Sequence, residues 1–140
     1  MARSTTSLRL DDDLRERLAT RAEIEGVSVT FLVERLLSEG LSMAEHPGIV
    51  FRPGRTGRRA AVAGGPDVWT IASALRRTSG SEAKKIAALA AEFGIHERQI
   101  AIALDYTAAH YDEVQARVQA NDAAWEEAER VTKARQSLLA

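Results

Sequence analysis

The side chains best suited to catalysis or metal binding are three histidines and two groups of carboxylates. His46, His96 and His110 are far apart along the chain, and none has a second ligand at the spacing of a metal-binding motif. The carboxylates within residues 11–13 and 126–129 fall on predicted helix caps and helix surfaces, whereas catalytic carboxylates are typically buried. The chain also lacks cysteine. We therefore predict no enzyme activity, no metal site and no cofactor.

The N-terminal segment has the period-two alternation of a short strand. Leu8 and Leu10 share one predicted face, while Thr5, Ser7 and Arg9 share the other. A lone strand needs a ladder partner for its backbone N–H and C=O groups, and the neighbouring sequence supplies none. The simplest partner is the same strand of a second copy, paired antiparallel about a two-fold axis, so we predict a homodimer.

Two helices are predicted after this strand, within residues 1–45. Asp11 is suited to cap the first helix, and Gly26 is suited to end it. Ser28 is suited to cap the second helix, which is expected to stop at Gly40. The segment therefore has the predicted order strand, helix, turn, helix.

This order resembles the ribbon–helix–helix DNA-binding motif of the MetJ/Arc/CopG regulators, over residues 3–41. The similarity is carried by the run TTSLRLD at residues 5–11, by two leucines in the first helix, and by the turn GVSVT at residues 26–30. Thr6 departs from the family, which usually has an aliphatic core residue at this position.

The resemblance implies a role for each face of the ribbon. Leu8 and Leu10 would lie in the dimer core, and the outward side chains would enter the DNA major groove and contact base edges. The start of the second helix would bind phosphate through backbone N–H groups. Taken alone, the alternation also fits the solvated face of an edge strand. The implied DNA-binding residues are Thr5, Ser7, Arg9, Ser28, Val29 and Thr30.

A basic segment lies between two acidic ones, with eight Lys and Arg against two Asp and Glu in residues 46–85. Two strand-like runs, residues 48–52 and 58–62, flank the sequence PGRTG and predict a β-hairpin. Its four arginines could follow the DNA backbone, dock on an acidic protein surface such as a nuclease active site, or stay solvated. They are Arg52, Arg55, Arg58 and Arg59.

Helices are predicted for the rest of residues 46–110. One begins after Asp67, another is capped by Ser81, and a third follows His96, which is expected to cap it or lie on the surface. Residues 46–69 and two later stretches resemble a small domain of unknown function that follows ribbon–helix–helix segments in toxin–antitoxin operons. This resemblance implies a PIN-like ribonuclease toxin as partner.

Residues 111–140 contain neither Gly nor Pro and predict one long amphipathic helix. Its apolar positions would suit a partner, the protein's own second domain or the dimer mate. Acidic groups beside them complement the basic surface expected of a ribonuclease. The predicted toxin-binding residues are Val118, Trp125, Glu126 and Glu129.

The sequence therefore predicts a mainly helical protein with short β structure, in three parts. These are a ribbon–helix–helix domain at residues 1–45, a hairpin-plus-helices domain at 46–110, and the amphipathic helix at 111–140. Hydrophobic residues make up 45% and charged residues 28% of the chain, and no apolar run is long enough to cross a membrane. Without a secretory segment, we expect a cytoplasmic protein that does not contact membranes.

The predicted function is that of a type II antitoxin. Such a protein is a homodimer that represses its own operon by binding operator DNA, and it neutralises a ribonuclease-like toxin. Two alternatives are a ribbon–helix–helix transcription regulator without a toxin, and a protein-interaction module whose ribbon only dimerises.

Overall fold

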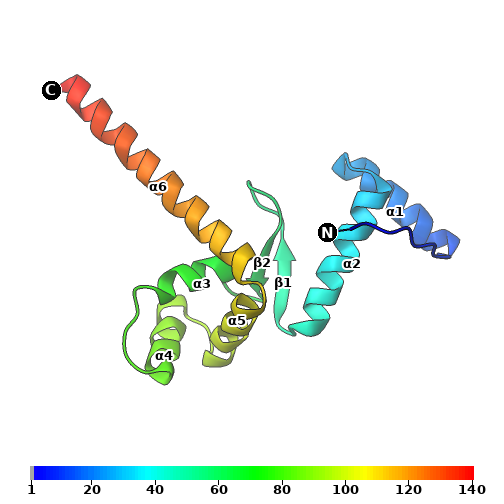
Figure 1. Cartoon of the computed structure of the whole chain (residues 1–140), viewed down its shortest axis with the longest axis horizontal. Coiled ribbons are helices and arrows are strands. Elements are labelled where there is room, and N and C mark those ends of the chain that lie inside the picture. The colour runs from blue at the N-terminus through cyan, green and yellow to red at the C-terminus, as the bar shows by residue number, and fades with distance from the viewer. Residues whose placement is uncertain (1) are drawn as a thin grey trace. The chain divides into compact units, whose positions relative to one another are not determined.

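The computed structural model describes residues 2–140, and its two compact units are Met1–Leu41 and Ser42–Ala140. The chain is mainly helical, with one antiparallel hairpin and a long C-terminal helix, as predicted (Figure 1). No helix within residues 2–140 has both the length and the apolar character needed to cross a membrane. The elements are α1 (Asp12–Glu25), α2 (Val29–Glu45), β1 (Ile49–Arg52), β2 (Arg59–Val62), α3 (Val68–Leu75), α4 (Glu82–Phe93), α5 (Glu97–Ala109) and α6 (Tyr111–Leu139).

Local capping sets the ends of the helices in the first unit. The Asp11 carboxylate accepts a hydrogen bond from a backbone N–H three residues further on (2.8 Å), at the start of α1. Gly26 ends α1 with a φ of 67°, a conformation that favours glycine. The Ser28 hydroxyl accepts a backbone N–H in the same way at the start of α2 (3.1 Å). All three residues act as predicted.

The first unit differs in two features from the predicted order of strand, helix, turn and helix. The predicted stop at Gly40 is wrong, because α2 continues through it to Glu45. A glycine inside a helix costs only about 1 kcal/mol relative to alanine, which neighbouring residues can offset. Residues 2–10 have no regular secondary structure in the single chain. Since their strand is expected only when two chains pair, the ribbon stays a prediction.

The second unit begins with the predicted hairpin, in which β1 and β2 pair antiparallel with Ile49 opposite Val62. Gly48, directly before β1, has a φ of 100°. A Cβ at this position would lie 2.9 Å from Cδ1 of Ile102 on α5. The positive φ favours glycine here, and a Cβ would also force the terminal methyl of Ile102 to move.

Helices α3, α4, α5 and the start of α6 pack with the hairpin around one core. His96 caps α5, because its Nδ1 accepts the N–H of Arg98 (3.0 Å) while the Gln99 side chain accepts the N–H of His96 (2.9 Å). This confirms the capping role predicted for His96. The largest fully buried side chains of this unit are Tyr106, Ile71, Leu89, Ile100, Val62, Val68 and Val118.

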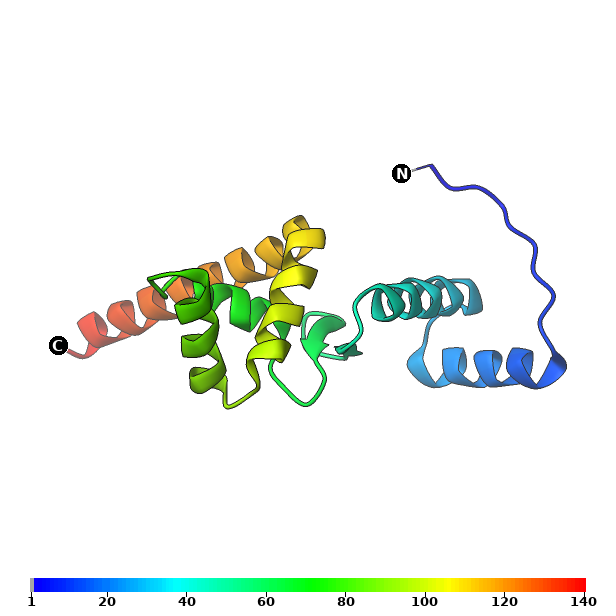
Figure 2. The ribbon, with the colours of Figure 1, turned by 90° about the horizontal axis from the view of Figure 1, so that it is seen from below.

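The long helix α6 has two halves with different surroundings. Val114 and Val118 of the first half are buried in the core, and Arg117 donates to the carbonyl oxygen of Arg58 (2.6 Å). Every residue from 123 to 140 is exposed. Both ribbon views show this second half extending beyond the other helices of its unit (Figure 1, Figure 2). The apolar seam predicted for α6 is therefore divided between core and surface.

Candidate functional site

The residues predicted to contact bases lie on the extended segment before α1. Thr5, Ser7 and Arg9 are exposed, and Leu8 on the alternate positions is 64% exposed. Leu10 is half-buried. The single chain thus leaves polar and apolar positions of this segment accessible, together with backbone that could pair with another strand.

The start of α2 presents Ser28, Val29 and Thr30 at the surface. The first N–H groups of a helix have no partner within the helix, and the Ser28 side chain already accepts that of Phe31. The N–H groups of Val29 and Thr30 are therefore directed outward at the positive end of the helix dipole. This arrangement is suited to binding a phosphate group.

The helices of the first unit leave an apolar surface exposed. Among residues 2–41, only Ala22 and Leu32 are buried. Val29, Leu37 and Leu41 are separated by multiples of four residues, so they follow one row along α2, which we call the α2 apolar row. Their exposed fractions are 45%, 54% and 62%. Exposed apolar surface of this kind marks interaction sites.

The four hairpin arginines do not form one available basic cluster. Arg52 donates to backbone carbonyl oxygens on β2 (3.1 Å) and in the turn after it, and Arg59 Nε lies 2.6 Å from an Asp67 carboxylate oxygen. Arg58 is half-buried and donates to the backbone of β1 (3.4 Å). Arg55 is exposed. The sequence left three roles open for the four arginines, namely contact with DNA, docking on an acidic protein surface, or solvation. The prediction for Arg52 and Arg59 needs correction, because they are engaged within the hairpin and its turn.

The predicted toxin-binding residues fall on both halves of α6. Val118 is 1% exposed and belongs to the core, so its predicted contact with a partner is corrected here. Trp125, Glu126 and Glu129 are exposed, and Trp125 is 73% exposed. Trp125 and Glu129 are four residues apart, so they share one face of the helix.

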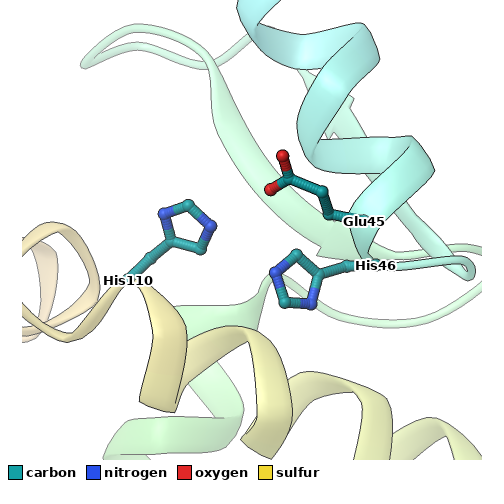
Figure 3. Close-up of side chains that lie close together, drawn as sticks. All are labelled: Glu45, His46 and His110. Carbon is teal, nitrogen blue, oxygen red and sulfur yellow. The ribbon is translucent and has the colours of Figure 1, made fainter.

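The structure also brings together side chains that are distant in the sequence. Glu45 ends α2, His46 follows it, and His110 joins α5 to α6. One ligand atom of each side chain lies within 4.8 Å of the other two. Figure 3 shows the carboxylate and a nitrogen of each ring turned toward one shared space. We call these residues the Glu45–His46–His110 cluster.

Tyr106 of α5 supports both imidazole rings of this cluster. Its ring stacks on His110 (centroids 4.3 Å apart, planes at 23°) and meets His46 edge to face (5.2 Å, 73°). Tyr106 is 1% exposed, and its hydroxyl donates to the Glu113 carboxylate (3.2 Å). Burial, followed by the neighbouring carboxylate, raises the pKa of Tyr106 well above its ordinary value. The hydroxyl therefore keeps its proton at neutral pH.

This cluster could not be expected from the sequence, because the hairpin and three helices separate His46 from His110. A weak signal was present only for His110, which lies between two predicted helices, because the predicted stop at Gly40 left His46 six residues beyond a helix end. No protein-family model, curated protein or solved structure matches the chain. Its function must therefore be inferred from its own residues.

Proposed function

We propose that the chain is a homodimeric, sequence-specific DNA-binding regulator of the ribbon–helix–helix type. The observation that carries this proposal is the exposed apolar surface of the first unit. Two buried side chains, Ala22 and Leu32, cannot offset the entropy cost of ordering such a unit. A second copy would cover the α2 apolar row and Leu8, and would also supply the ladder partner for the segment before α1.

In such a dimer the paired segments would form a two-stranded ribbon that fits the DNA major groove. Thr5, Ser7 and Arg9 would face the bases, where hydroxyl and guanidinium groups can hydrogen-bond to base edges. The N–H groups of Val29 and Thr30 would hold flanking phosphates and set the orientation of the ribbon. Each copy therefore contributes both a base contact and a phosphate contact.

The test is selection of bound sequences from a randomised duplex library with the full-length protein. On the selected site, Arg9→Ala should weaken binding by about 1–3 kcal/mol, and it should affect random DNA much less. Arg98→Ala is the matched control, because Arg98 is exposed on α5 of the other unit. Equal losses on selected and random DNA would reduce Arg9 to a phosphate contact. Failure to enrich any sequence would contradict the proposal and favour the interaction module.

The exposed half of α6 favours a second function, in which this regulator is also an antitoxin that represses its own operon. Residues 123–140 are exposed, and they include Trp125, Glu126 and Glu129. Tryptophan is among the residue types most often found as interface hot spots. Acidic side chains beside it would complement the basic surface of a toxin that holds RNA, such as a PIN-like ribonuclease.

The product of the adjacent reading frame provides the test of the antitoxin function. If it is a small ribonuclease, Trp125→Ala should weaken its binding by roughly 30-fold or more, equivalent to at least about 2 kcal/mol. Leu139→Ala is the control, because Leu139 is exposed on the same helix. Unchanged binding by Trp125→Ala would place the toxin contact elsewhere, with Arg55 the next residue to test. Absence of a ribonuclease neighbour would favour a regulator without a toxin.

A further inference from the structure

The Glu45–His46–His110 cluster has the ligand types of a transition-metal site. A carboxylate and two imidazoles bind Zn²⁺ in sites that keep a fourth position for water. Tetrahedral coordination at Zn–N and Zn–O distances of about 2.0–2.2 Å places ligand atoms roughly 3.4 Å apart. The three ligand atoms already lie within 4.8 Å of one another. Rotation of the exposed Glu45 side chain can close the remaining distance.

The two imidazoles are positioned by the fold. The backbone N–H of His46 donates to the carbonyl oxygen of Ser42 (2.8 Å), and the backbone N–H of His110 donates to the carbonyl oxygen of Tyr106 (2.9 Å). His110 has a φ of −125°, which interrupts the helical path between α5 and α6 and turns this residue toward the cluster. The buried Tyr106 ring contacts both imidazoles. Ligands held in this way lose little conformational freedom when an ion binds.

A carboxylate also lies behind one of the rings. An oxygen of Glu113 is 3.8 Å from Nδ1 of His110, and the same carboxylate accepts the Tyr106 hydroxyl. Metal-binding histidines usually have such a carboxylate near the ring nitrogen that does not bind the ion, because it fixes the orientation of the ring. Glu113 is placed to orient His110 in this way, leaving Nε2 for the ion.

We propose that the Glu45–His46–His110 cluster binds one divalent transition-metal ion of the Zn²⁺ class, with a water molecule as the fourth ligand. This proposal differs from the sequence-based prediction, in which no histidine has a second ligand at the spacing of a metal-binding motif. The ion would join the end of α2 to the junction of α5 and α6, two parts of the second unit that the hairpin and three helices separate in the chain. The proposal does not depend on DNA binding.

The test is a Zn²⁺ titration by calorimetry of untagged, full-length protein that has been treated with a chelator. We expect one ion per chain, micromolar or tighter affinity, and no comparable binding of Mg²⁺, which prefers oxygen ligands. Glu45→Gln and His110→Ala should each weaken binding by at least about 10-fold, since even outer-shell changes have effects of this size. Co²⁺ should give the visible absorption bands of a tetrahedral site in the wild type and lose them in both variants.

His96→Asn is the matched control, because asparagine can still cap α5 and His96 lies outside the cluster. It should bind Zn²⁺ as the wild type does. Glu45 is exposed, so Glu45→Gln is expected to leave the circular dichroism spectrum unchanged even if His110→Ala disturbs packing on Tyr106. Wild-type affinity in Glu45→Gln and His110→Ala would overturn the proposal, as would equal loss in His96→Asn. Equal affinity for Mg²⁺ would also overturn it.

Discussion

The two units of this chain are built from similar helices but differ in how much surface those helices bury. The second unit packs side chains from its hairpin and four helices into a continuous core. Among residues 2–41, the first unit buries only Ala22 and Leu32. Both units nevertheless have well-capped helices, with Asp11 on α1 and Ser81 on α4. Local capping therefore defines where a helix begins, whereas independent stability depends on a packed core that the first unit lacks.

The largest expected effect tests whether the first unit is completed by a second copy. Leu37→Glu places a carboxylate on the α2 apolar row. It loses about 1.5–3 kcal/mol of leucine burial and adds several kcal/mol for an unpaired buried charge in each copy. If the proposed dimer uses this face, the variant should be a monomer in analytical ultracentrifugation at concentrations where the wild type is dimeric. Leu139→Glu changes another exposed leucine and should stay dimeric. If Leu37→Glu stays dimeric, the first unit does not use this face.

A core truncation tests the second unit. Leu89 is fully buried on α4, so Leu89→Ala should lower the free energy of unfolding by about 2–5 kcal/mol, through lost burial and a residual cavity. Urea unfolding monitored on the second unit should show this loss at every protein concentration. If the loss of unfolding free energy disappears at high protein concentration, this core depends on packing against another chain.

The raised pKa of Tyr106 predicts a loss of stability in alkali. In the unfolded chain the phenol ionises near pH 10, whereas in the folded protein it keeps its proton to higher pH. Its contribution to stability is therefore complete below about pH 10. Above that it falls by about 1.4 kcal/mol per pH unit until the folded phenol also ionises.

Tyr106→Phe should reduce this alkaline loss in urea unfolding between about pH 9 and 11. Tyr111→Phe is the control, because Tyr111 is 59% exposed, and it should follow the wild type. The same pH dependence in wild type and Tyr106→Phe would assign the alkaline loss to other groups.

The smallest effects come from a matched pair of caps, one in each unit. Asp11→Ala and Ser81→Ala each remove a side-chain acceptor at a helix start, and each should cost about 1 kcal/mol. Thermal unfolding should detect both losses. Only Asp11→Ala should also raise the dissociation constant of the proposed dimer, because α1 belongs to the unit that we propose is completed by a second copy. Equal effects on dimerisation would remove the distinction between the units.

Much of the fold could be predicted because its signals are local. The caps at Asp11 and Ser81, the glycine that ends α1 and the hairpin flanking PGRTG all depend on neighbouring residues. Gly40 was a misleading local signal, since glycine in the αR conformation can stay inside a helix. A glycine ends a helix when its φ is positive, and the sequence alone does not show which glycines have a positive φ.

The candidate sites were predicted less well, because they depend on contacts between distant segments. Arg52 and Arg59 belong to a basic stretch of the sequence. In the structure, however, Arg52 donates to carbonyl oxygens on β2 and in the turn after it, and Arg59 pairs with the Asp67 carboxylate. Val118 fits the same seam as Trp125, yet the core ends between them. The approach of His46 to His110 also follows only from tertiary packing.

The exposure of residues 123–140, which include the second half of α6, affects how readily proteases cut the chain. Within residues 123–140, the Glu127–Arg130 pair supports the helix (2.6 Å), and such a pair contributes only about 0.2–0.5 kcal/mol. This end should therefore unwind far more often than the core opens, and proteases cut segments that unwind. A partner bound along it would hold the helix closed. The amount of intact protein would then follow the supply of that partner, with uncovered chains trimmed first.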